Sequence, residues 1–100
     1  FPKAEASYKK AIENFPENLG FYKDLSDLYR FDYAEKAHLA DDTLLEALKI
    51  SPKNITALAW LGGYYRDTGD TKKAREYFQR ALNLDPANTA IQAELKELGK

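Results

Sequence analysis

The sequence contains no cysteine and no methionine, and only one histidine and one tryptophan. Without cysteine the chain can form no disulfide, no thiolate nucleophile and no cysteine-ligated metal site. The single histidine, His38, cannot supply the three or four ligands that a metal site needs, and we expect an ordinary surface or half-buried residue. The sequence therefore predicts no metal, no cofactor and no enzyme.

An excess of charge and a long apolar run are also missing. Fifteen Lys and Arg face 16 Asp and Glu, which gives a net charge of −1. Because a nucleic-acid partner selects a strongly basic surface, we expect no nucleic-acid binding. No run reaches the ~18 apolar residues of a membrane span, and no cationic segment leads into an apolar one as in a signal peptide. We therefore expect no membrane span and a cytoplasmic location.

The chain begins at Phe1 rather than at a methionine. We therefore expect a segment of a longer protein, whose remaining part could carry an export signal. The adjacent carboxylates of Asp41 and Asp42 raise the question of a metal or acid–base pair. On a helix they point about 100° apart and suit the positive dipole of a helix start, so we interpret them as ordinary surface acids.

A Pro-x-Asn tripeptide occurs three times, starting at Pro16, Pro52 and Pro86. Proline disrupts a helix interior because it lacks an N–H group and its ring clashes with the preceding turn. Asparagine is a preferred N-cap, whose side-chain oxygen accepts from a free backbone N–H. Each tripeptide therefore predicts the end of one helix, a turn, and the start of another.

The residues before each proline repeat as well. An alanine, a large residue and a second alanine stand 12, 8 and 5 positions before it: Ala4, Tyr8 and Ala11; Ala40, Leu44 and Ala47; Ala74, Phe78 and Ala81. After each of the first two tripeptides, a stripe follows the i, i+3, i+4, i+7 spacing of an amphipathic helix: Tyr22, Leu25, Ser26 and Tyr29; Leu58, Leu61, Gly62 and Tyr65. We expect these stripes to pack, with Gly62 facing the small Ala74.

The second stripe and the alanine–aromatic pattern after it, ending at Pro86, resemble one full tetratricopeptide repeat of 34 residues. This resemblance implies an all-α fold, a right-handed superhelix of antiparallel helix hairpins in a single domain. The segments implied are a second helix of a truncated repeat (1–16), a divergent repeat (19–52), a near-consensus repeat (53–86) and a capping helix (87–100).

The capping helix has an apolar stripe formed by Ile91, Leu95 and Leu98. We expect this stripe to close against Leu82 and Leu84. Gly99 stands where a left-handed C-cap is common.

The divergent repeat carries two extra residues between Arg30 and Lys36 and lacks a turn glycine such as Gly69. Either its first helix runs half a turn longer or the turn bulges. Residues 31–36 contain neither glycine nor proline, which favours the longer helix.

The resemblance also implies a function, because the first helices of such repeats line a groove that binds proteins or peptides. The groove residues expected here are Lys23, Asp27, Arg30, Phe31, Trp60, Gly63 and Arg66. Trp60 lies about 200° around the helix from Leu58, outside the core stripe, so it either contacts a partner or is covered by neighbours. Arg30 and Arg66 each follow a stripe tyrosine, so stacked repeats would bring them side by side, where they either hold a carboxylate or are simply solvated. Gly63 either admits a partner's backbone or is neutral.

Other functions stay open at this point. The chain could be a purely structural or oligomerisation segment, and the strip of Ala4, Tyr8 and Ala11 predicts self-association. Some tetratricopeptide repeats clamp the acidic C-terminus of a chaperone with five Lys, Asn and Arg residues. We do not expect such a clamp here, because Lys23 is the one of these five positions that keeps the required residue type. The near-zero net charge argues against RNA binding by a related helical-hairpin repeat. An enzyme would need a catalytic domain elsewhere.

Overall fold

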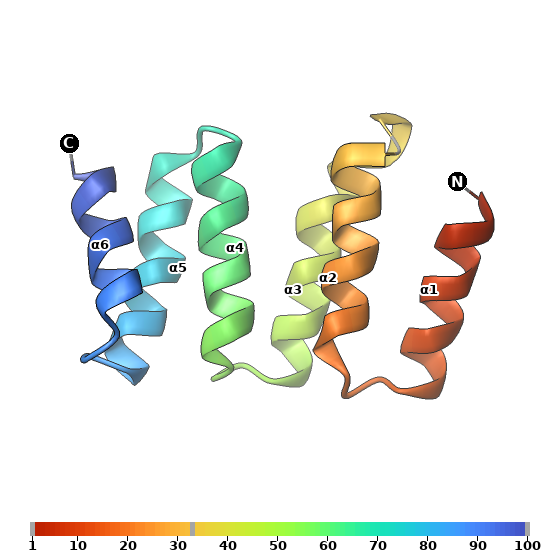
Figure 1. The fold of residues 1–100 in the computed structure, drawn as a ribbon, viewed down its shortest axis with the longest axis horizontal. Helices are drawn as coiled ribbons and strands as arrows, with labels where there is room; N and C mark the ends of the chain where they lie inside the picture. Colours follow the sequence, from red (N-terminus) through yellow and green to blue (C-terminus); the bar gives the residue numbers. More distant parts are fainter. Residues whose placement is uncertain (1, 33, 100) are drawn as a thin grey trace. The chain divides into compact units, whose positions relative to one another are not determined.

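A computed structural model describes residues 2–32 and 34–99, and this part of the chain contains helices and no strand. The helices are α1 (Pro2–Asn14), α2 (Leu19–Asp27), a π-helical turn η1 (Leu28–Asp32), a 3-10 segment η2 (Ala34–Leu39), α3 (Ala40–Ile50), α4 (Ile55–Asp67), α5 (Thr71–Leu84) and α6 (Thr89–Leu98) (Figure 1). The predicted all-α class of helix hairpins is confirmed. None of the described helices is long and apolar enough to cross a membrane.

The predicted joints lie where the Pro-x-Asn tripeptides stand. Helices α1, α3 and α5 each end two residues before a proline of the motif. The side-chain oxygens of Asn18, Asn54 and Asn88 accept hydrogen bonds from backbone N–H groups in the first turns of α2, α4 and α6, at 3.1, 3.0 and 3.1 Å. These bonds satisfy donors that a helix start otherwise leaves without a partner.

The turn between α4 and α5 depends on Gly69 and Asp70. Gly69 has a φ of +91°, in the left-handed region that side chains with a Cβ avoid. Asp70 then caps α5 by accepting a hydrogen bond from the backbone N–H of Lys73 at 3.1 Å. The described chain divides into two compact units, residues 1–50 and 51–100.

In residues 1–50, α1 and α3 both pack on α2. Their buried apolar residues are Leu19, Tyr22, Leu25, Leu28, Tyr29, Ala40, Leu44, Ala47 and Leu48. The α2 and α3 backbones approach closely at Ser26, whose buried hydroxyl donates a 2.7 Å hydrogen bond to the carbonyl oxygen of Ala40. A larger side chain at Ser26 would push the two helices apart.

In residues 51–100, α5 packs against both α4 and α6. The buried apolar residues are Ala57, Leu58, Leu61, Tyr65, Ala74, Phe78, Ala81 and Ile91. The nearest neighbour of Gly62 is Phe78 of α5, and the expected contact with Ala74 stays a prediction. A Cβ atom built on Gly62 would lie 2.8 Å from the ring of Phe78, so the aromatic ring fills the space that the glycine leaves.

Two expectations for the C-terminal end are wrong: the left-handed C-cap at Gly99 and the closing of Leu84 against α6. Gly99 has φ −78° and ψ −10°, right-handed helical values, because its N–H continues the helical bonding to the carbonyls of Leu95 and Lys96. Leu84 is 43% exposed and lines a shallow hollow with residues that include Pro52 and Leu58. Leu82 is half-buried, and Ile91 is the buried residue of α6.

The two extra residues of the divergent repeat are absorbed between α2 and α3. The first helix does continue to Asp32, but its last residues form the π-turn η1 rather than further α-helix. A π-turn accommodates an extra residue in one turn of helix, and Tyr29 remains buried. The chain then enters η2, where Lys36 has non-helical values of φ −115° and ψ 16°. Position 33 lies outside the described residues.

Candidate binding surface

On α2 and η1, the expected groove residues form two local pairs. The ammonium of Lys23 lies 2.8 and 2.7 Å from the two carboxylate oxygens of Asp27, one helical turn away. The guanidinium of Arg30 lies 4.7 Å from the ring centroid of Phe31, whose side chain is 68% exposed. This stretch therefore presents an internally neutralised ion pair and an exposed aromatic ring beside a cation.

On α4, Trp60, Gly63 and Arg66 follow one another at three-residue intervals and share one side of the helix. Trp60 is half-buried. A Cβ atom built on Gly63 would meet one atom within 4 Å, an Nη of Arg66 at 3.8 Å, so the space above this glycine is open. A partner's backbone could approach α4 at this position.

Arg66 already holds carboxylates of its own chain. Its Nε donates to Asp67 at 2.9 Å, and its Nη1 donates to Glu94 of α6 at 2.5 Å. The hydrogen bonds that Arg66 donates to Asp67 and then to Glu94 raise the pKa of Arg66 still further above its ordinary value. A carboxylate from a partner must therefore compete with Glu94 for this guanidinium.

Six of the seven expected groove residues lie next to another one of the set. Within each unit, the neighbours are Lys23 with Asp27, Arg30 with Phe31, and Gly63 with Arg66. Arg30 belongs to residues 1–50 and Arg66 to residues 51–100, so the expected pairing of these two arginines stays a prediction.

A buried carboxylate, Glu5, escaped the sequence analysis. It accepts a 2.7 Å hydrogen bond from the hydroxyl of Tyr29 and two from the ammonium of Lys36, at 2.9 and 2.8 Å. The hydrogen bonds from Lys36 and then Tyr29 lower the pKa of Glu5 from 4.5 to about 2. The partner Lys36 lies in the extra segment, whose path no helical pattern specifies. Nothing in the sequence therefore indicated this network.

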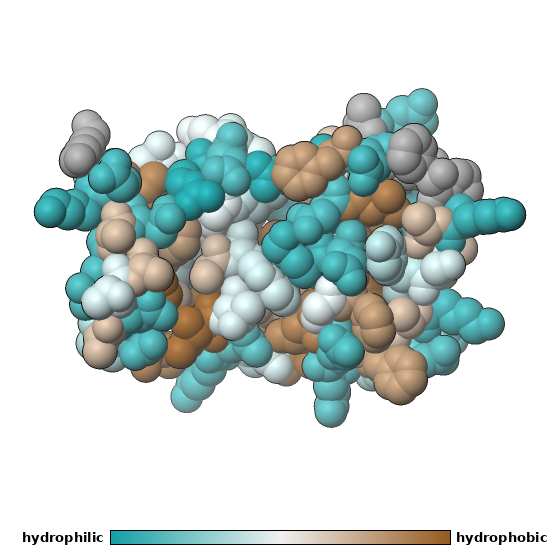
Figure 2. Space-filling view, in the orientation of Figure 1, coloured by the Kyte–Doolittle hydropathy of each residue, from teal (hydrophilic) through white to brown (hydrophobic). Residues whose placement is uncertain are grey.

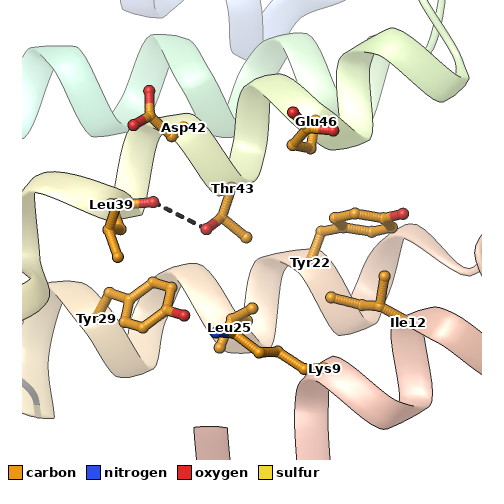
Figure 3. Close-up of a pocket in the computed structure, with 9 residues that line it drawn as sticks. All are labelled: Lys9, Ile12, Tyr22, Leu25, Tyr29, Leu39, Asp42, Thr43 and Glu46. Atoms are coloured by element: carbon orange, nitrogen blue, oxygen red, sulfur yellow. Dashed lines mark hydrogen bonds between the residues drawn. The ribbon is translucent and has the colours of Figure 1, made fainter. Parts of the chain in front are cut away.

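A cleft in residues 1–50 was missed as well (Figure 3). Its volume is about 360 Å³. The residues that line it are Lys9 and Ile12 of α1, Tyr22, Leu25 and Tyr29 of α2 and η1, and Leu39, Asp42, Thr43 and Glu46 of η2 and α3. The spacing of Asp42 and Glu46, one helical turn apart, was the available signal.

His38 is exposed, and the described residues contain no group of three or more metal-ligating side chains. On the face seen in Figure 2, hydrophilic side chains separate the hydrophobic surface into patches. The strip of Ala4, Tyr8 and Ala11 on α1 is half-buried.

Residues 55–88 match the family described as "Tetratricopeptide repeat", which confirms the resemblance and overlaps the near-consensus repeat expected at 53–86. The chain is similar over 98% of its length to the DnaJ homolog subfamily C member 3 homolog of Dictyostelium discoideum (26% identity, 20% of that protein) and to tetratricopeptide repeat protein 37 of Xenopus laevis (30% identity, 6% of that protein). A probable peptide N-acetylglucosaminyltransferase, SPINDLY, of Solanum lycopersicum is 39% identical over half of this chain.

These matches each cover a small part of the relatives. The chain spans 20% of the Dictyostelium protein and 6% of the Solanum and Xenopus proteins. What it shares with them is therefore a segment of repeats, and such repeats generally serve as protein–protein interaction modules.

Proposed function

Taking residues 55–88 as a tetratricopeptide repeat, we propose that this chain is a non-catalytic interaction module that holds a peptide or a segment of a partner protein. The observation that carries the proposal is the side of α4 on which half-buried Trp60 stands next to the open space above Gly63. A large aromatic side chain beside a backbone that a guest can approach is a typical anchor point of an interface.

In this proposal the residues of α4 have different roles. Trp60 anchors an apolar side chain of the partner, and Gly63 lets the partner's backbone lie against the helix. Arg66 orients the partner through a carboxylate that displaces Glu94. Because the ion pair of Arg66 and Glu94 is partly exposed, exchanging one carboxylate for another costs little free energy.

Within residues 1–50, the residues of α2 and η1 form a separate proposed contact surface. The exposed ring of Phe31, with Arg30 beside it, would contact an apolar or aromatic group of the partner. The neutralised pair of Lys23 and Asp27 would form a polar rim, which contributes to orientation more than to affinity.

A peptide-display selection on the 100-residue chain tests this proposal. Selected peptides should lose about thirtyfold in affinity on Trp60→Ala, because an interface hot spot contributes at least about 2 kcal/mol. Phe15→Ala is the matched control, since it removes an exposed aromatic side chain from a turn outside the proposed surface. A selection without binders, or binders indifferent to Trp60→Ala, would refute the proposal.

A structural or self-associating role is the second candidate. It is favoured by the half-buried strip of Ala4, Tyr8 and Ala11, whose remaining exposed area a second copy could cover. Sedimentation over a wide range of concentrations should then show a dimer that Tyr8→Gln weakens. A monomer at every concentration would exclude this role.

A further inference from the structure

We propose that the cleft between α1 and α3 is a second binding site, for a partner segment that inserts an apolar side chain and places a Lys or Arg beside α3. The cleft shares no residue with the surface proposed above, and it lies within residues 1–50. Figure 3 shows Ile12 and Lys9 from α1 on one side and Asp42 and Glu46 of α3 on the other.

The interior of the cleft is apolar enough to bind an apolar side chain of a partner. Leu25 is buried, while Ile12 and Leu39 are half-buried and keep part of their apolar surface open to solvent. A volume of about 360 Å³ lies at the small end of the roughly 300–1,000 Å³ range of ligand pockets. The cleft therefore has room for one or two side chains of a partner rather than for a whole helix.

The hydroxyl groups around the cleft are already engaged within the chain. The Tyr22 hydroxyl donates to the carbonyl oxygen of Pro16 at 3.3 Å, and the Tyr29 hydroxyl donates to Glu5 at 2.7 Å. The Thr43 hydroxyl donates to the carbonyl oxygen of Leu39 at 2.8 Å, the bond drawn in Figure 3. With these donors engaged, the two tyrosines present mainly ring carbon to a guest, and a polar guest would lose more hydration than it regains.

The charges at the rim select a cation. Asp42 and Glu46 place two exposed carboxylates one turn apart on α3, opposite the single ammonium of Lys9, which lies 3.5 Å from Glu5. The negative charge of Glu46 contributes, after burial, to the raised pKa of Tyr22, so its field reaches the cleft. Glu46 lies 3.7 Å from Lys49 in an exposed pair that a partner's cation can replace. An acidic partner would meet an unfavourable field.

The test uses a short helical peptide with acetylated and amidated ends, carrying one Leu with a Lys one turn away on each side. Titrated into the 100-residue chain, it should shift the NMR methyl signals of Ile12, Leu25 and Leu39. The double variant Asp42→Asn and Glu46→Gln should weaken binding roughly fivefold to tenfold, the effect of losing two partly exposed ion pairs.

The control double variant, Glu13→Gln and Asp24→Asn, removes the same charge from exposed positions that do not line the cleft. It should leave the affinity unchanged, as should Trp60→Ala, which separates this site from the proposed groove. An equal loss in the control, a loss on Trp60→Ala, signal changes confined to α4, or no binding of the peptide would each overturn the proposal. A peptide with Glu in place of Lys should not bind.

Discussion

Gly62 and Gly63 are neighbours in the interior of α4, and we expect alanine to have opposite effects on stability at the two positions. At Gly62 a Cβ atom would lie 2.8 Å from two ring carbons of Phe78 and 2.9 Å from a third. Phe78 is only 3% exposed, so its ring lies inside the core and can shift only by displacing its neighbours. At Gly63 the nearest atom is the far end of the Arg66 side chain, 3.8 Å away.

The expected magnitudes follow from these contacts. Replacing glycine by alanine inside a helix contributes about 0.5–1 kcal/mol of stability at either position. Gly63→Ala should gain this amount, because ordinary van der Waals distance remains. Gly62→Ala adds an overpacking cost of roughly 1–3 kcal/mol, since the buried ring must shift. The difference between the two variants should therefore be about 1–3 kcal/mol, with the change in helix propensity cancelled.

Urea unfolding followed by far-UV circular dichroism measures this difference, and thermal unfolding provides a second value. For a domain of this size, 1 kcal/mol corresponds to roughly 4–8 °C in Tm. The unfolded-state effects of the two substitutions are nearly the same, because the glycines are adjacent and the substitution is identical. If Gly62→Ala is as stable as Gly63→Ala, the close contact with Phe78 does not limit the packing of α4 and α5, and the reasoning is refuted.

Three further predictions concern single side chains. The folded state lowers the pKa of Glu5 from 4.5 to about 2, so its ionised form stabilises the fold above about pH 4.5, and this contribution is lost as the pH falls toward 2. Glu5→Gln should weaken the dependence of the urea midpoint on pH between about 4.5 and 2. A pH dependence equal to that of the unsubstituted protein would contradict the lowered pKa of Glu5. Asn54→Ala and Asn88→Ala should each cost about 0.5–2 kcal/mol by loss of a cap, measured by thermal unfolding. Glu94→Gln should change stability by less than about 1 kcal/mol yet raise the affinity of carboxylate-bearing peptides, because it removes the negative charge that competes for Arg66. Titration calorimetry measures this affinity, and an unchanged value would contradict the role of Arg66.

The regular part of the fold was predictable from the sequence because its signals are local. A proline ends each helix pair, and an asparagine two residues later caps the next helix through a bond to a backbone N–H two or three residues on. The apolar stripes around Leu58 and Leu61 have the spacing of a helix face, and both residues are buried. At these positions the local signals and the observed burial match, so helix ends and buried faces follow from the sequence alone.

The features that the sequence did not indicate lie where tertiary packing, or the last turn of a helix, decides the structure. The ring of Phe78 lies against Gly62, and residue size along the sequence does not indicate which side chain fills that space. Gly99 keeps right-handed values because α6 continues its helical hydrogen bonding to that residue. The bond from Lys36 to Glu5 joins residues 31 positions apart and depends on the path of an irregular segment. Such contacts carry no periodic signal along the chain.

Of the candidate surface, the sequence indicated which residues of α4 avoid the core, since helix geometry determines that. It did not indicate that Arg66 already binds Glu94, because this ion pair depends on how α6 packs on α5. The sequence also did not indicate the cleft, because its size depends on the distance between α1 and α3 where both pack on α2. Periodicity identifies the buried face of a helix and leaves such separations undetermined.

The π-turn and 3-10 segment between α2 and α3 have a consequence for engineering. The described residues of this stretch, 28–32 and 34–39, connect α2 to α3, and Tyr29 and Ala40 at its two ends are both buried. Residues can therefore be added in this stretch without moving the buried residues of α2 and α3 to other positions in the core. A recognition sequence or a reporter tag grafted there would change the outline of the protein while its interior stays as it is, provided that Lys36 keeps its hold on Glu5.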